Sequence, residues 1–582
     1  MRQVITTIIF SSIFIAANAQ NIMVNQVGFY PDAPKYAITD NITETDFRII
    51  EEKSGKTVLK GKAGEAILHD GTQSTMRYLD FSKLKEEGKF HIIMGENRSH
   101  TFLISNKVWK ETANALMKSY YYQRCSTELR PEHAGKWERA AGHPDTKCFV
   151  HPSAKTDKSF ISAPGGWYDA GDYGKYVVNA GVTTAILLYL AEHYPNIFPD
   201  GSLNIPESGN GTNDLLDEIR YELKWLSKMQ DTDGGVFFKL TSKNFCKTIM
   251  PEEDKMKRFV IGKTSASALN FAAVMAIAAR VYESTDKDFA EKCLVQAENA
   301  WKWANDNDIT VFTNPEDIKT GEYGDKRLTD EFVWAASELY ISTQKKDYKD
   351  FISNNIDKLN IWNNKNRTFT PGWANTDMLA VISLASSNKG KPFNGRCKEY
   401  IFNSALKISE EVKKNAGRIP NMKYNWGSNS ELANKAWILL VAARTAGEKD
   451  YINAASEIAD YFLGKNPLGK SFITGMGTNR VMNPHHRIST ADGIEEPVPG
   501  LLAGGPNAKM NDKNFVKYSS HQPAMAYMDI ESSYASNEVA INWNAPATVV
   551  FTILNYIYGD NPLHPTNTFF YPSNSSLKIR HA

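Results

Sequence analysis

The longer part of this chain is a succession of segments with helical periodicity, separated by loops rich in Gly, Pro and Asn. Several segments are apolar on more than one face, such as the Ala-rich residues 265–280, and a helix that is apolar nearly all round is a buried helix. Twelve helices, some of them buried, fit two concentric rings. We therefore predict a mainly α protein in which residues 106–582 form an (α/α)6 barrel. The helical segments are residues 107–123, 175–194, 212–230, 264–284, 287–305, 328–343, 346–360, 374–386, 396–415, 430–446, 448–464 and 545–558.

The preceding residues, 20–105, have a different pattern. Short β-rich runs such as Phe47–Ile50 and Phe90–Met94 are separated by turn formers such as Gly71 and Asn97. Few segments here show helical periodicity. About 85 residues of this kind predict a small β-sandwich. Because no low-complexity linker follows, we expect the sandwich to pack directly on the barrel.

The N-terminus has the pattern of a secretory signal peptide. Arg2 supplies a positive charge, an uncharged and largely apolar run extends from Val4 to Ala17, and residues 17–19 are small. The apolar run is too short to span a bilayer comfortably, and no later stretch has the pattern of a membrane span. We expect residues 1–19 to be removed and the protein to be secreted or periplasmic.

Charge and aromatic content narrow the choice of partner. The chain has 67 Lys and Arg against 66 Asp and Glu, so it lacks the basic excess expected of a nucleic-acid-binding protein. Its 12 Trp and 26 Tyr supply rings of the kind that line a sugar-binding cleft, although most such rings in any protein belong to the core. Five cysteines exclude a dense disulfide framework but leave one or two bridges open. A neutral partner fits this composition better than nucleic acid.

Residues 165–176 form the segment richest in chemistry. Two carboxylates, Asp169 and Asp172, lie three residues apart in a glycine-rich turn that opens a predicted helix. The helix dipole favours ionised carboxylates near a helix start, and an ionised carboxylate is what a general base needs. The alternative is an N-cap with a turn aspartate, and an isolated pair of this kind is more often structural.

A second segment, residues 471–487, ends in Asn-Pro-His-His-Arg. Its His and Arg side chains can donate hydrogen bonds to sugar hydroxyls or to a carboxylate. A metal pair made by His485 and His486 is the alternative. Adjacent His residues on a loop rarely bind one ion together, and no nearby Cys or carboxylate completes a tetrahedral set. We therefore expect no metal here.

A third segment, residues 527–546, places three carboxyl groups among aromatic and amide side chains just before the last predicted helix. A carboxyl group beside apolar groups has a raised pKa and can act as a general acid. By chemistry alone, Asp529, Glu531 and Glu538 cannot be ranked for that role.

Together these segments resemble glycoside hydrolase family 9, the cellulase family once called E. The resemblance covers nearly the whole mature chain. Residues 22–29 resemble the immunoglobulin-like domain that precedes the barrel in many members, and residues 321–325, 330–335 and 424–429 resemble further family segments. The family's histidine signature is matched at Ser471, Ile473, Thr474, Gly477, Asn479, Pro484, His485 and Arg487, and its second signature at Tyr527, Asp529, Tyr534, Glu538, Ala540, Asn544 and Ala545.

This resemblance implies a barrel with an open cleft and hydrolysis with inversion at the anomeric carbon. Carried over by position, Asp172 is the base that activates water, Asp169 helps to hold that water, and Glu538 protonates the leaving oxygen. His485 and Arg487 are expected to contact the substrate near the cleavage point. Inversion needs two carboxyl groups about 6.5–9.5 Å apart, and only a closed barrel can bring residues so distant in sequence together. The candidates for contact with sugar rings are Trp334, Trp373, Tyr424, Trp426 and Tyr534.

Metal binding is where the chain departs from the family. Related enzymes often bind zinc through a Cys after the first helix, a Cys-His pair and a His before the Asp-Ala-Gly-Asp turn. Here Cys125 and His143 remain, but Gly142 and Tyr168 occupy the other two places, so we expect no zinc. Calcium is common in the family, but this sequence gives no specific ligand set for it, and catalysis is expected to need no cofactor. The residues that could compensate for the missing zinc ligands are Cys148 and His151.

The expected protein is a monomeric, secreted, inverting endo-β-1,4-glucanase that acts on a polysaccharide or oligosaccharide of the β-glucan type. One alternative is an exo-acting β-glucosidase or β-glucosaminidase of the same fold, which would have a cleft blocked at one end. Another is specificity for a decorated or mixed-linkage glucan such as xyloglucan. The last is a carbohydrate-binding protein without catalysis, against which the presence of Asp169, Asp172 and Glu538 argues.

Overall fold

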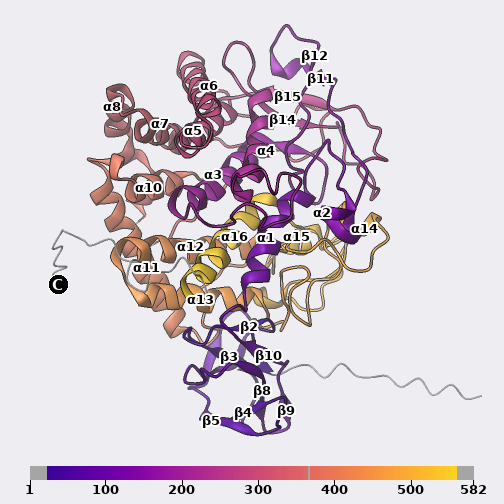
Figure 1. Cartoon of the computed structure of the whole chain (residues 1–582), viewed down its shortest axis with the longest axis vertical. Helices are drawn as coiled ribbons and strands as arrows, with labels where there is room; N and C mark the ends of the chain where they lie inside the picture. Colours follow the sequence, from indigo (N-terminus) through magenta and orange to yellow (C-terminus); the bar gives the residue numbers. More distant parts are fainter. Residues whose placement is uncertain (1–21, 365–366, 560–582) are drawn as a thin grey trace, which may run out of the picture.

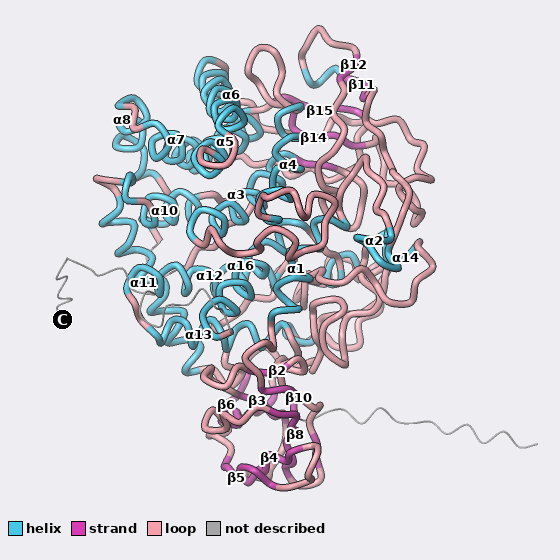
Figure 2. Tube along the Cα trace, in the orientation of Figure 1, coloured by secondary structure: helices cyan, strands magenta, loops and turns pink. Residues whose placement is uncertain are grey.

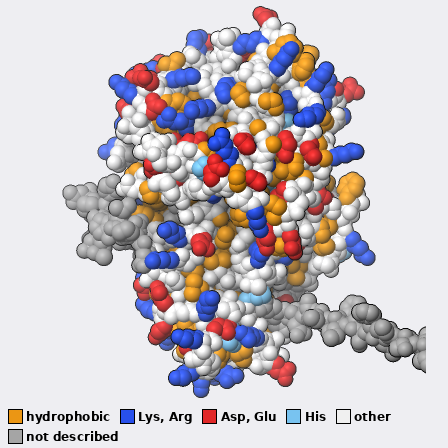
Figure 3. Space-filling model, turned by 45° about the vertical axis from the view of Figure 1, so that its right-hand side comes forward, with side chains coloured by type: hydrophobic (Ala, Val, Ile, Leu, Met, Phe, Trp, Pro, Cys, Tyr) orange, Lys and Arg blue, Asp and Glu red, His pale blue; other side chains and the backbone are white. Residues whose placement is uncertain are grey.

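The computed structural model describes residues 22–364 and 367–559, and the predicted signal peptide lies outside them. A small β-sandwich, at the bottom of Figure 1, precedes a large helical domain. The last strand of the sandwich ends at Ile104 and the first helix begins at Lys110. On the face shown in Figure 3, acidic and basic side chains are interspersed over both parts.

Two sheets form the sandwich and confirm the predicted β-rich part. Apolar side chains that alternate along the strands, such as Phe47 and Ile49, are buried between the sheets. The ring of Phe29 packs edge-on against Phe81 and Phe102, with centroids 5.2 and 5.5 Å away. One sheet has the order β1 (Ile22–Met23), β3 (Tyr36–Asp40), β7 (Ser74–Asp80), β6 (Ile67–His69). The other has the order β2 (Gly28–Phe29), β10 (Phe102–Ile104), β8 (Gly88–Met94), β4 (Asp46–Glu51), β5 (Thr57–Lys62), and β9 (Asn97–Arg98) pairs with β8.

The helical domain has the predicted two rings, which confirms the (α/α)6 barrel. Each inner helix contacts the next and the last contacts the first, so the inner ring is closed: α3 (Val177–His193), α5 (Ser265–Tyr282), α7 (Thr329–Thr343), α10 (Asp377–Ser386), α12 (Ser428–Ala446) and α16 (Ile541–Tyr558). Each outer helix packs on the inner helix next to it in sequence: α4 (Asp214–Lys228) on α3, α6 (Lys287–Asp306) on α5, α8 (Lys346–Asn355) on α7, α11 (Asn394–Lys414) on α10, α13 (Lys449–Phe462) on α12, while α1 (Lys110–Tyr122) packs on α16. Helix α11 also packs on α12, and α13 also contacts α16. The loops carry the short helices α2 (Pro131–Ala134), α9 (Asn360–Asn363), α14 (Arg487–Ala491) and α15 (Tyr534–Asn537).

The two rings differ in how their side chains are distributed. Helix α4 of the outer ring has one apolar stripe, with Leu215, Ile219 and Leu223 four residues apart and buried against the inner ring. Inner helix α5 is buried on nearly all sides, as its Ala-rich sequence predicted. In the part of the chain that the structure describes, α5 alone is long and apolar enough to cross a bilayer, and 89% of it is buried inside the protein.

A five-stranded sheet among the loops was not predicted from the sequence. Its order is β12 (Phe160–Ile161), β11 (Cys148–Val150), β15 (Phe259–Lys263), β14 (Phe237–Thr241), β13 (Lys175–Tyr176). Strand β13 leads directly into α3, so this sheet fixes the end of the glycine-rich turn that contains Asp169 and Asp172. Figure 2 shows the loops gathered on the side of the barrel opposite α8, α10 and α11.

The sandwich packs directly on the barrel. The indole nitrogen of Trp109, just before α1, donates to the carbonyl oxygen of Gly28 at 2.9 Å. The hydroxyl of Tyr30 donates to Asn555 of α16 at 2.8 Å. Both contacts join the edge of the sandwich to outer helix α1 and inner helix α16, which pack on each other.

Gln26 makes the most extensive polar contact between the sandwich and the barrel loops. Its side-chain nitrogen donates to the carbonyl oxygen of Gly469 at 2.7 Å. Its side-chain oxygen accepts from the backbone N–H groups of Thr478 at 2.9 Å and Asn479 at 2.7 Å. The sandwich therefore fixes the loop that leads to the His485 segment.

Candidate active site

A cleft of about 750 Å³ brings the three chemical segments together. Most of its lining comes from loops that lead into the inner helices, so the cleft lies at the end of the barrel where those helices begin. Its lining residues are Asp172, Tyr176, Phe245, Lys319, Gly321, Glu322, Tyr323, Trp373, Trp426, His485, Arg487, Tyr534, Glu538 and Trp543.

The glycine-rich turn places Asp172 at the cleft and Asp169 beneath it. The turn is closed by a hydrogen bond from Asp169 N to Gly174 O at 2.9 Å, and Gly174 N donates to Asp172 Oδ2 at 2.8 Å. Gly171 is required for close approach, because a Cβ atom there would lie 2.2 Å from the carbonyl oxygen of His485. The turn and the His485 segment are therefore in backbone contact.

Asp169 is fully buried, and its carboxylate is held from two sides. Asn179 Nδ2 donates to it at 3.0 Å, and the hydroxyl of Tyr323 donates to it at 2.9 Å. Burial, followed by the nearby charge of Asp172, raises the pKa of Asp169 to about 7, against the lowering effect of these hydrogen bonds. The two hydrogen bonds fix the orientation of the carboxyl group. With a pKa of about 7, the group is partly ionised near neutral pH.

Glu538 is far from this turn in the sequence but borders the same cleft. It follows the short helix α15, and its carbonyl oxygen accepts from Gly504 N at 2.8 Å. Burial, followed by the charges of Asp172 and Asp169, raises the pKa of the Glu538 carboxyl well above its usual range. The protonated form of this carboxyl is therefore favoured, as a general acid requires.

His485 and Arg487 both border the cleft between the two carboxyl segments. His485 Nδ1 donates to the carbonyl oxygen of Glu531 at 2.6 Å, which leaves Nε2 for other partners, and burial lowers the pKa of this imidazole. The guanidinium of Arg487 donates to the carbonyl oxygens of Gly171 at 2.9 Å and Cys246 at 3.3 Å. The next residue, His486, is buried and bonded to Gln123 and Ser489 instead.

Three of the five predicted aromatic contacts line the cleft. Trp426 is 45% exposed, and its ring centroid lies 5.5 Å from that of Tyr534. Trp373 lies against Tyr323, with centroids 5.2 Å apart.

Two predicted aromatic contacts must be corrected. Trp334 is 0% exposed on inner helix α7, where its indole nitrogen donates to Glu338 at 3.1 Å, so it is a core residue. Tyr424 is 3% exposed and packs against Gly71 of the sandwich rather than lining the cleft. Neither ring is free to stack on a sugar.

Several residues of the site were not predicted from the sequence. Tyr323 lies in a glycine-flanked segment that resembled the family, and that context was the available signal for it. Trp543 closely follows Glu538 in the sequence, whereas no sequence feature indicated Phe245. Asp529, left without a role, accepts from the N–H groups of Met482 at 3.1 Å and Asn483 at 2.9 Å. It therefore joins the second and third chemical segments.

The place of the family's zinc site is filled by protein contacts. His143 Nδ1 lies 2.8 Å from the hydroxyl of Tyr168, and its Nε2 lies 3.1 Å from Asp254 Oδ2, so both ring nitrogens have partners. A Cβ atom on Gly142 would lie 2.5 Å from Pro251, which leaves no room for a ligating side chain. These residues do not fit zinc. Across residues 22–364 and 367–559, no group of three or more His, Cys, Asp or Glu is arranged as metal ligands, and the five cysteines are free.

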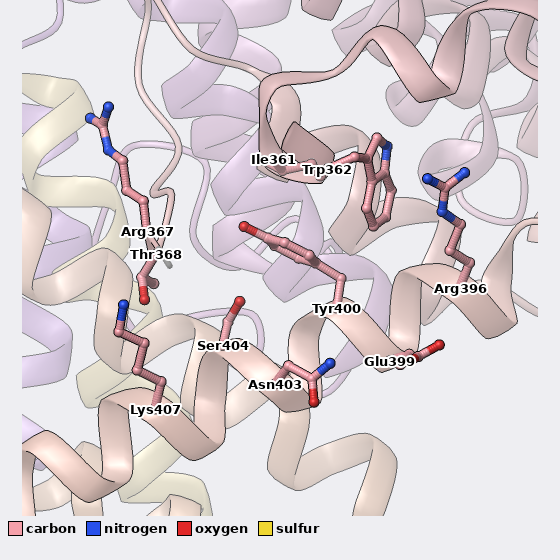
Figure 4. A pocket seen from close by; sticks show the side chains of 10 residues that line it. All are labelled: Ile361, Trp362, Arg367, Thr368, Arg396, Glu399, Tyr400, Asn403, Ser404 and Lys407. Carbon is pink, nitrogen blue, oxygen red and sulfur yellow. The ribbon is translucent and has the colours of Figure 1, made fainter. Parts of the chain in front are cut away.

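A smaller hollow of about 280 Å³ on the outside of the barrel differs in chemistry from the cleft. It lies between the α9 region and α11 (Figure 4), where Tyr400 and Lys407 project from α11. Its one Trp, Trp362, has a ring face covered by the guanidinium of Arg396 at 4.0 Å. With Glu399 as its only carboxyl group, this hollow lacks the acid–base pair that the cleft contains.

A closed (α/α)6 barrel with two carboxyl groups on one aromatic-lined cleft has the architecture of a glycoside hydrolase. The chain matches the family model for glycosyl hydrolase family 9 over residues 109–551 and that for the cellulase N-terminal ig-like domain over residues 17–99. The protein belongs to glycosyl hydrolase family 9 and carries the immunoglobulin-like domain.

Named relatives align over nearly the whole chain. The xyloglucan-specific endo-beta-1,4-glucanase BoGH9A of Bacteroides ovatus is 37% identical over 92% of this chain and 93% of its own length. Endoglucanase D of Acetivibrio thermocellus is 32% identical over 92% of this chain and 80% of its own length. A solved structure described as Bacteroides ovatus GH9 superimposes with a TM-score of 0.85 at 35% identity, covering 93% of this chain and all of that one.

Proposed function

We propose that this protein is an inverting endo-β-1,4-glucanase. The observation that carries the proposal is the pairing of Asp172 with Glu538 at one cleft, where Glu538 has a raised pKa and Asp172 accepts a backbone N–H. One carboxyl group whose protonated form is favoured and one that accepts hydrogen bonds are the acid and base that glycoside hydrolysis needs.

In the proposed mechanism, Asp172 takes a proton from a water molecule while the oxygen of that water attacks the anomeric carbon. Glu538 gives its proton to the glycosidic oxygen on the opposite side, and the bond between that oxygen and the anomeric carbon breaks. Asp169, fixed by Asn179 and Tyr323, helps to hold the attacking water. The products are two shorter chains, one with an inverted reducing end, and proton exchange with solvent restores both carboxyl groups.

Substrate binding is proposed to rest on the rings and the basic groups of the cleft. The exposed ring of Trp426 offers a face on which a sugar can stack, and Trp373 and Tyr534 extend the aromatic lining. His485 Nε2 remains available to a sugar hydroxyl. The named relatives support β-1,4-glucans as the substrate class, and xyloglucan belongs on the list because one relative is specific for it.

Two measurements on the purified protein test this proposal. With carboxymethylcellulose, lichenan and xyloglucan, viscosity should fall faster than reducing ends accumulate, because internal cuts shorten chains early. Proton NMR during the first minutes should show new α-anomeric reducing ends, since β-linked substrates are inverted. Asp172→Asn serves as the matched inactive control. Release of monosaccharide alone from chain ends would refute endo action, and initial β-anomers would refute inversion.

We also propose that the protein works outside the cytoplasm, after removal of residues 1–19. The charged, apolar and small-residue regions of the N-terminus support this. Cell fractionation should place the activity in the periplasm or medium, and mass spectrometry should find a mature chain that begins at Gln20. Activity confined to the cytoplasm with an intact N-terminus would contradict the proposal.

A further inference from the structure

Lys239 is a fully buried lysine on β14 with an unusual set of partners. Its ammonium group donates to three uncharged oxygens, Asn314 Oδ1 at 2.7 Å, Thr320 Oγ1 at 3.2 Å and Gly321 O at 2.7 Å. Within the described residues it forms no ion pair. A buried charge without an ionic partner is costly, so a residue needed only to fill this space would be apolar.

The three acceptors belong to one loop, residues 312–324, that forms part of the cleft wall. The same loop carries Tyr323, whose hydroxyl donates to the buried carboxylate of Asp169. Gly321 N also donates to the hydroxyl of Tyr176 at 3.1 Å. Lys239 thus fixes the loop that orients Asp169, and it does so from the buried side of that loop.

The ammonium group also lies close to the turn that contains the proposed base. Lys239 pairs with Tyr176 between β14 and β13, and its nitrogen lies 5.5 Å from the centroid of that ring. The Tyr176 hydroxyl and Asp172 Oδ2 converge on Gly174, each 2.7 Å from where a Cβ would stand. The titratable groups that face Lys239 are Asp172, Glu322 and Tyr176, and its partner on β15 is the apolar Ile261.

We propose that Lys239 is a positioning residue for hydrolysis, which holds the 312–324 loop in place and thereby orients Asp169 through Tyr323. The proposal rests on the proposed function, in which Asp172 is the base and Asp169 helps to hold the attacking water. Burial lowers the pKa of Lys239 to about 7, while the charges of Asp172 and Glu322 oppose that shift. Loss of the Lys239 proton at alkaline pH therefore removes one donor to the loop.

Two substitutions test this role. Lys239→Met is similar in length but removes the donors to the loop, whereas Lys239→Gln keeps a donor. In folded Lys239→Met, kcat on a soluble glucan should fall by about tenfold or more with a smaller change in KM, because the loop that orients Asp169 loses its donors. Lys239→Gln should lose less kcat than Lys239→Met.

The matched control is Lys287→Met. Lys287 on α6 is 76% exposed, and its ion pair is with Glu291 of the same helix, so its substitution should leave kcat and KM unchanged. Circular dichroism establishes that each variant is folded. Wild-type kcat in folded Lys239→Met would overturn the proposal while leaving the proposed function intact. Full activity of Asp172→Asn would instead refute the proposed function.

Discussion

Gln26 provides a direct test of how the sandwich supports the catalytic loops. Gln26→Ala removes three hydrogen bonds to backbone groups of Gly469, Thr478 and Asn479 at a junction where Gln26 is only 6% exposed. Each such bond contributes about 1 kcal/mol net, so the expected loss of unfolding free energy is about 3 kcal/mol. Because the freed loop leads to His485, we also expect a lower kcat.

Urea unfolding followed by tryptophan fluorescence measures the first effect, and hydrolysis of a soluble glucan measures the second. Gln73→Ala is the control, since Gln73 is exposed on the same domain and its side chain bonds only to the carbonyl of Asp70. The control should unfold at the wild-type urea concentration with wild-type kcat. If Gln26→Ala matches the control in both measurements, the sandwich does not hold the catalytic loops through this side chain.

Three further predictions concern the cleft. Asp169→Asn removes a negative charge that raises the pKa of Glu538, so that pKa falls and the alkaline limb of the kcat/KM profile should move to lower pH; an unmoved limb would show that the two groups are not coupled. Trp426→Ala should raise KM about tenfold or more through loss of ring stacking while leaving the unfolding midpoint unchanged, since this ring is exposed, and an unchanged KM would remove it from the binding surface. Dialysis against EDTA should leave kcat on a soluble glucan unchanged, because the proposed acid and base are protein carboxyl groups, and activity restored only by added metal would contradict this.

Periodicity in the sequence was sufficient to predict the barrel because the residue pattern of an inner helix indicates by itself that the helix is buried. The Ala-rich α5 is apolar nearly all round, and no long-range information is needed to infer that it is enclosed. The carboxyl groups of the cleft followed from the family resemblance of the glycine-rich and signature segments, because chemistry alone did not rank Asp529, Glu531 and Glu538.

The errors and omissions involve contacts made across the fold. Trp334 and Tyr424 were predicted to meet sugar, but one points into the core from α7 and the other packs against the sandwich. An aromatic side chain in a helix or loop looks the same in sequence whichever way it points. Lys239 was missed for a similar reason, because its partners lie on a distant loop and only the pairing of β13 with β14 brings it under the cleft.

The assignment of Glu538 as acid and Asp172 as base is tested most directly by comparing two leaving groups. A sugar hydroxyl needs a proton to leave, whereas dinitrophenolate hardly does, and general acid catalysis contributes about 10²–10⁴-fold. Glu538→Gln should therefore lose about that factor on glucan but far less on a dinitrophenyl cello-oligosaccharide, while Asp172→Asn should lose activity on both. Equal losses of Glu538→Gln on the two substrates, in a protein shown to be folded by circular dichroism, would contradict the assignment.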